Sequence, residues 1–123
     1  IDKSLISEGC IINAKAITKS VIGIRSRIGE GTVIQNSYVM GNDFYQDIDA
    51  MNEDIANNLQ LMGIGKRCFI YNAIVDKNCR IGNDVYINGG AHLENVSHEL
   101  YAVKEGIVVI KKGVTIPDGY TIK

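Results

Sequence analysis

Apolar residues recur along this chain at intervals of six. The pattern is I-x-x-x-[small or β-branched]-x-I, as in "IGEGTVI" at 28–34 and "IGNDVYI" at 81–87. An α-helix repeats every 3.6 residues and a strand every two, so neither alone explains a period of six. The positions in step are Ile22, Ile28, Ile34 and Met40; Val75, Ile81 and Ile87; and Ile110, Ile116 and Ile122.

A short strand followed by a tight corner does explain this period. Each unit then forms one side of a triangular coil, with its repeating Ile directed to the axis and Gly, Asn or Asp at the corner. By resemblance to hexapeptide-repeat proteins, we expect an all-β, left-handed parallel β-helix. The steps Ile12–Ile17–Ile22 and Ile70–Val75 are five residues long, which predicts irregular coils there.

Two segments interrupt the repeat. The segment 41–63 carries five of the 14 acidic residues and none of the 13 basic ones, so the remainder of the chain is net positive. Met51, Ile55 and Leu59 are four apart, which predicts a short amphipathic helix capped by Asp49. A metal site built from these acids is an alternative. The segment 88–106 holds His92 and His98 and is predicted to be a loop or short helix.

Composition narrows the class of protein. The 123 residues fit a single domain, residues 1–123, and the formal net charge of −1 gives no sign of a nucleic-acid or membrane partner. Three cysteines without paired spacing favour a reducing, intracellular location. Cys10, Cys68 and Cys79 each occupy the small position of the repeat, which predicts buried fillers rather than reactive thiols.

The chemistry-bearing residues do not form a complete active site. Hexapeptide acyltransferases use a His general base and carbonic anhydrases of this type need three His, but both histidines here lie outside the repeats. Lys77 and Lys112 each follow a repeating apolar residue by two positions, on an exposed corner. With the arginines of neighbouring units they could bind phosphate groups. These arginines are Arg25, Arg27, Arg67 and Arg80.

Longer phrases resemble one family. "SVIGIRSRIGEGTVIQNSYVMGNDFYQ", "GIGKRCFIYNAIVDKNCRIGNDVYI" and "GIVVIKKGVTIPDG" are similar to the carboxyl-terminal β-helix domain of ADP-glucose pyrophosphorylase (glucose-1-phosphate adenylyltransferase). The resemblance implies that the chain is the C-terminal part of a longer two-domain enzyme. Catalysis with ATP and Mg²⁺ would then belong to a nucleotidyltransferase domain outside this chain, and this domain itself would need no cofactor.

The resemblance also implies a regulatory role. In the family, the Lys of the "DKN" phrase and the Lys five residues before the Pro of the final "IPDG" turn bind phosphorylated effectors. They correspond to Lys77 and Lys112, with Lys111, Arg80 and Arg25 as further candidate residues. The implied partners are the catalytic domain and sister subunits of a tetramer. The implied location is the cytoplasm, or a plastid in a plant.

Two other functions stay open at this stage. A stand-alone hexapeptide acyltransferase would form a trimer and bind coenzyme A between subunits. A purely structural solenoid would bind no ligand. Separately from these alternatives, the end coils of a solenoid have uncovered edges, so we expect the isolated chain to self-associate through these ends.

Overall fold

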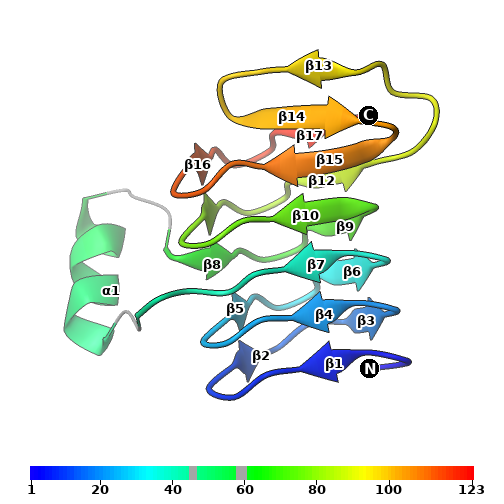
Figure 1. Ribbon diagram of the computed structural model, residues 1–123. Helices are drawn as coiled ribbons and strands as arrows, with labels where there is room; N and C mark the ends of the chain where they lie inside the picture. Colours follow the sequence, from blue (N-terminus) through cyan, green and yellow to red (C-terminus); the bar gives the residue numbers. More distant parts are fainter. Residues whose placement is uncertain (45–46, 58–60) are drawn as a thin grey trace.

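The computed structural model describes residues 1–44, 47–57 and 61–123, and in these the chain winds into a stack of three-sided coils (Figure 1). Each side of the coil contributes one strand to a parallel sheet that runs along the stack. The first sheet has the order β1-β4-β7-β10-β15-β14-β13, the second β16-β11-β8-β5-β2, and the third β17-β12-β9-β6-β3.

The strands are short, as six-residue units require. Those of the first sheet are β1 (Leu5–Ile6), β4 (Val21–Ile22), β7 (Tyr38–Val39), β10 (Ala73–Val75), β13 (Val96–Ser97), β14 (Tyr101–Lys104) and β15 (Ile107–Ile110). Those of the second are β2 (Ile11–Ile12), β5 (Arg27–Ile28), β8 (Gly63–Ile64), β11 (Arg80–Ile81) and β16 (Thr115–Ile116). Those of the third are β3 (Ala16–Thr18), β6 (Val33–Gln35), β9 (Phe69–Tyr71), β12 (Tyr86–Asn88) and β17 (Thr121–Ile122).

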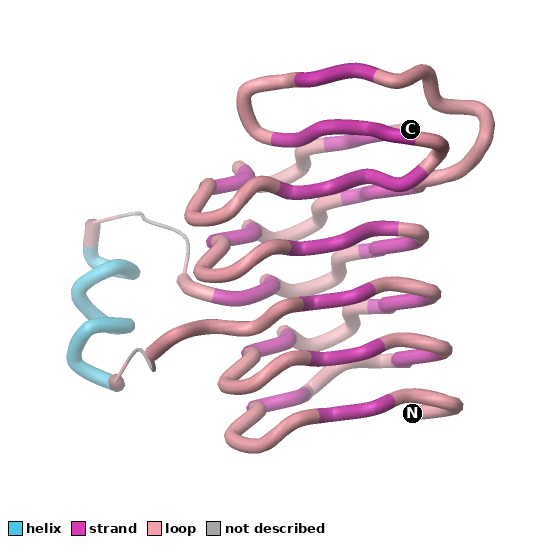
Figure 2. Tube along the Cα trace, in the orientation of Figure 1, coloured by secondary structure: helices cyan, strands magenta, loops and turns pink. Residues whose placement is uncertain are grey.

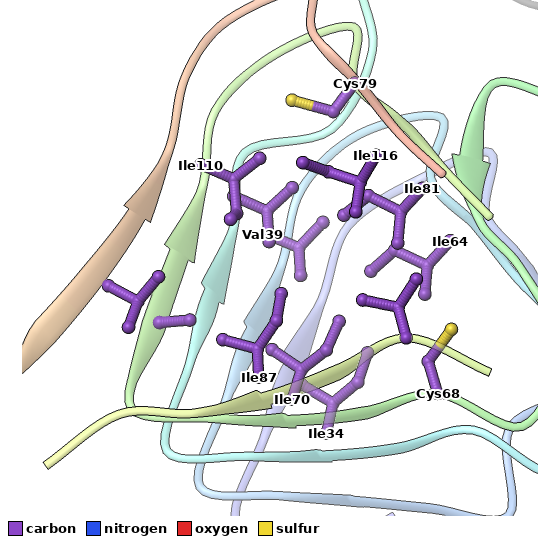
Figure 3. Packing of buried hydrophobic residues seen from close by; sticks show 14 of the residues in the cluster. Ile34, Val39, Ile64, Cys68, Ile70, Cys79, Ile81, Ile87, Ile110 and Ile116 are labelled. Carbon is purple, nitrogen blue, oxygen red and sulfur yellow. The ribbon is translucent and has the colours of Figure 1, made fainter. Parts of the chain in front are cut away.

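The core is a set of aliphatic columns inside the coils. Figure 3 shows one column from each sheet: Val39 and Ile110; Ile64, Ile81 and Ile116; and Ile34, Ile70 and Ile87. All of these side chains are at most 5% exposed, as the six-residue period predicts. The register is strict, since Ile34 pairs with Ile70, and Ile70 pairs with Ile87.

One member of the predicted series was wrong. Val39, not Met40, is the next buried aliphatic residue after Ile34. The inward step at the corner between the third and first sheets is five residues, one shorter than the six-residue repeat. Asn36 turns this corner with a φ of 48°, a left-handed conformation that Asn tolerates. Lys19 and Asn72 turn the same corner in other coils, which accounts for the steps Ile17–Ile22 and Ile70–Val75. The remaining five-residue step, Ile12–Ile17, lies at the corner between the second and third sheets.

The predicted insertion leaves the coil after β7 and returns at β8. Its described residues include the helix α1 (Ile48–Ala56), which stands to the side of the stack (Figure 2). The predicted cap was wrong: Asp47 caps α1 by accepting the Ala50 N–H, and Asp49 lies in the first turn. The predicted helix position at Leu59 lies outside the described residues. No described residue of α1 is buried, and its Asp54 forms an ion pair with Arg80 of the stack.

The segment 88–106 is a loop only in part, since it also contains the strands β13 and β14, which the sequence did not predict. Its β14 pairs antiparallel with β15, and β13 pairs antiparallel with β14, so the hairpin covers the edge of the first sheet at one end of the stack. Glu105 and Gly106 both have positive φ, which is the two-residue turn preferred in hairpins. An edge strand with unpaired amides would recruit other chains, and this hairpin protects it.

The cysteines lie where the sequence predicted. Cys68 and Cys79 are 2% and 3% exposed, while Cys10 is half-buried. Burial raises the pKa of the Cys79 thiol to about 11 and also raises the pKa of Cys68. Their protonated thiols are therefore packing groups rather than nucleophiles.

Candidate anion-binding site

Lys77 and Lys112 occupy equivalent corners of adjacent coils. Val75 of β10 pairs with Ile110 of β15. Lys77 lies two residues after Val75, and Lys112 lies two residues after Ile110. The Gly113 N–H donates to the Lys77 carbonyl at 3.0 Å, which continues the alignment through the corner. Neighbouring parallel strands are about 4.8 Å apart, so the two ammonium groups extend from nearly the same place on the surface.

The backbone at these corners is set by the residues that follow the lysines. Asn78 has a φ of 61° and Gly113 a φ of 73°, both in the left-handed region. Asn and Gly are the residues that adopt this conformation at least cost. A Cβ added at Gly113 would meet open space, so the glycine serves the backbone turn rather than close packing.

Asp43, from the start of the insertion, lies against this corner. Its Oδ1 accepts from Lys77 Nζ at 3.1 Å, and its Oδ2 accepts from Asn78 Nδ2 at 3.0 Å. The Asp43 N–H in turn donates to Asn78 Oδ1 at 2.9 Å. Hydrogen bonds from Asn78 and Lys77, with the charges of Lys77 and Lys112, lower the pKa of the Asp43 carboxyl. This group is a carboxylate in the neutral pH range.

Lys111 and Lys112 differ in their surroundings. Lys111 Nζ donates to the His98 carbonyl in the hairpin, and the Lys111 N–H donates to the Leu100 carbonyl at 3.1 Å. Lys112 is exposed beside the Lys77 corner. Lys111 therefore attaches the hairpin to the stack, while Lys112 is the one placed next to Lys77.

Each of the four arginines has a partner within the protein, and Arg25 lies on the corner between the first and second sheets, as Lys77 does. Arg80 Nη1 lies 2.6 Å from Asp54 of α1, and this ion pair ties the helix to the second sheet. Arg25 Nε donates to the Asn42 carbonyl at 3.1 Å, and Arg27 Nε donates to the Met62 carbonyl at 2.9 Å. Arg67 pairs with Asp84 at 2.8 Å on the corner between the second and third sheets.

Asp43 and Asn78 contact the Lys77 corner, but the sequence did not predict them as members of the candidate site. Asn78 belongs to the same "DKN" phrase as Lys77, but it was interpreted as a corner residue without a binding role. Asp43 was grouped with the acids of the insertion. Its approach to Lys77 depends on how the chain leaves β7, for which the sequence carries no local signal.

Three of the five acidic residues of the insertion have separate partners. Asp43 contacts Lys77, Asp47 caps α1, and Asp54 pairs with Arg80. Across residues 1–44, 47–57 and 61–123 there is no group of three His, Cys, Asp or Glu side chains able to hold a metal ion.

Among the described residues, α1 is far too short to cross a membrane, and no candidate span is present. His92 and His98 are both exposed in the segment that precedes β14.

Comparison with known proteins connects this geometry to a family. The model of the GLGC left-handed parallel β-helix domain matches residues 1–121, which also gives the hand of the coil. The small subunit of glucose-1-phosphate adenylyltransferase from Zea mays is 38% identical over 125 residues, covering 99% of this chain and 100% of that sequence. The chain belongs to the family of GLGC left-handed parallel β-helix domains.

Proposed function

We propose that this domain is the regulatory and assembly domain of a glucose-1-phosphate adenylyltransferase, and that it binds phosphorylated small molecules at Lys77 and Lys112. Under this proposal, ADP-glucose and pyrophosphate are made from ATP and glucose 1-phosphate in a separate nucleotidyltransferase domain that uses Mg²⁺. The β-helix then serves as a rigid support whose occupancy by an effector alters the activity of its neighbour, in the cytoplasm or a plastid.

The observation that carries the proposal is the register of Val75 with Ile110. It stacks two exposed lysines on a frame whose strands are fixed by a continuous core. Because the frame is rigid, the backbone needs no further ordering when a phosphate group bridges the two ammonium groups, and the entropy cost is that of ordering the two lysine side chains. Lysine binds phosphate as a point charge, so no further fixed geometry is needed.

Assembly is supported by apolar surface on the outer face of the first sheet. A groove of about 540 Å³ there is lined in part by Leu5, Val21, Tyr38, Ile74 and Ile107. Leu5 is 71% exposed and Tyr38 48%. Contiguous apolar surface of this kind is typical of sites that pack against another domain or subunit.

Calorimetric titration of the 123-residue chain with inorganic phosphate and with 3-phosphoglycerate tests the proposal. We expect Lys77→Gln/Lys112→Gln to weaken binding at least about fivefold, because two charges next to the anion are removed. Lys3→Gln/Lys19→Gln is the matched control, because these lysines are also stacked on adjacent coils, at a different corner. Equal affinity in wild type and the Lys77/Lys112 variant would refute the site. Binding of coenzyme A in place of phosphate would favour the acyltransferase instead.

A further inference from the structure

The Asp43 carboxylate occupies the corner in the way that an external anion would. Each of its two oxygens accepts one hydrogen bond, from Lys77 Nζ at 3.1 Å and from Asn78 Nδ2 at 3.0 Å. A phosphate or carboxylate group of a ligand has the same need for donors on separate oxygens. Two donors at the proposed site, one on Lys77 and one on Asn78, are therefore already engaged by a group of the protein itself.

We propose that Asp43 is an internal ligand of the anion site, that an effector must displace it, and that Asn78 is then a binding residue for the effector. This inference rests on the proposed function, since it concerns how the Lys77–Lys112 site is filled. It adds two residues, one that competes with the ligand and one that binds it. It also makes the beginning of the insertion the first part of the chain to respond to an effector.

The surroundings of Asp43 allow this exchange. The neighbouring Asn42 is 6% exposed and is anchored through its Nδ2 to the Arg25 carbonyl at 2.9 Å, so the backbone before Asp43 is held to the stack. The Asp43 side chain is 46% exposed and that of Lys77 41%. An ion pair this exposed is weak, because water solvates both charges when they separate. Rotation of one side chain would open the site without disturbing the core.

Lys112 gives an external anion an advantage over Asp43. Lys112 lies near enough to Asp43 for its charge to lower the pKa of the Asp43 carboxyl. The side-chain hydrogen bonds to this carboxylate, however, come from Lys77 and Asn78. A phosphate group has more oxygen atoms and a larger charge than a carboxylate. It can keep the donors used by Asp43 and add a contact to Lys112.

The test compares phosphate affinity among variants of the 123-residue chain by calorimetry. Asp43→Asn removes the competing charge, and we expect it to tighten phosphate binding about three- to tenfold. Adding Asn78→Gly to this variant removes a donor while keeping a residue that suits a φ of 61°, and we expect it to abolish the gain. Asp84→Asn is the matched control, since it also removes an exposed carboxylate from an ion pair, with Arg67, and is expected to have no effect.

The outcomes separate this inference from the proposed function. If Lys112→Gln weakens phosphate binding while Asp43→Asn leaves it unchanged or weaker, the lysine site stands and the internal ligand is wrong. If Asp43→Asn tightens binding equally with and without Asn78, the competition stands but Asn78 is not a binding residue. If neither wild type nor Asp43→Asn binds phosphate, the proposed function fails and this inference fails with it. Thermal unfolding of each variant verifies that the fold is retained.

Discussion

Val75 of β10 and Ile110 of β15 are direct partners in the first sheet, and both side chains are buried on the axis of the coil. Because each is followed two residues later by a lysine, one backbone register determines both the packing of the core and the stacking of Lys77 on Lys112. Changes that disturb the coil should therefore also disturb the proposed site. The stability of the stack and the chemistry of its corner are best tested together.

Gly65→Ala should destabilise the stack because successive coils approach very closely at this residue. A Cβ at Gly65 would lie 2.5 Å from the Gly82 carbonyl oxygen of the next coil. We expect a loss of about 2 kcal/mol or more in the free energy of unfolding, measured with urea. Gly113→Ala is the comparison, since it meets no neighbour and carries only the strain of its positive φ, about 1 kcal/mol. Equal losses in the two variants would show that coil contact is not the cause.

Thr32→Val should cost about 1–3 kcal/mol, although it keeps the size of the side chain. The Thr32 hydroxyl is fully buried, donates to the Gly65 carbonyl at 2.8 Å and accepts from the Cys68 N–H at 3.1 Å. Valine leaves both backbone groups without these partners. Chemical denaturation measures the loss, and Thr121→Val on the exposed side of β17 serves as the control. A neutral effect of Thr32→Val would show that the hydroxyl does not join the coils.

Stability should fall as the pH rises from about 9 to about 11 because of Cys79. Burial raises the pKa of this thiol to about 11, so the folded chain keeps a proton that the unfolded chain has already lost. The contribution of the Cys79 thiol to stability is fully present below its pKa in the unfolded chain. It is lost as the pH rises through its pKa in the folded chain. Cys79→Ala should flatten the pH dependence of the urea midpoint over this range. An identical slope in wild type and variant would contradict the burial-induced shift.

The sequence predicted most of the fold because the apolar residues that point to the axis of the coil recur at intervals of six along the chain. It missed details that depend on contacts between distant segments. Val39 replaces Met40 at the axis because a corner turned by Asn36 is one residue short. It did not predict the hairpin of β14 and β15, although the "KEGI" turn is a local signal for it. Lys77 and Lys112 were found from spacing, whereas Asp43 reaches them through tertiary structure.

Exposed apolar residues of the first coil and the first sheet should promote self-association. Ile1, Leu5 and Ile11 are 77%, 71% and 57% exposed. We expect the chain to form dimers or larger species at micromolar concentrations in sedimentation experiments, and Leu5→Lys/Ile11→Lys to reduce them. Replacement of Ile48, which is 75% exposed on α1, is the control for apolar exposure elsewhere. A wild-type chain that sediments as a monomer at every concentration would exclude this surface as an interface.

The most direct measurement is a titration of the isotopically labelled chain with inorganic phosphate, followed by NMR of the backbone amides and the lysine side chains. We predict saturable shifts concentrated at Asp43, Lys77, Asn78, Lys112 and Gly113, with little change at the Lys3–Lys19 corner. Saturable shifts confined to that other corner, or no saturable shift at all, would contradict the assignment of the anion site to Lys77 and Lys112.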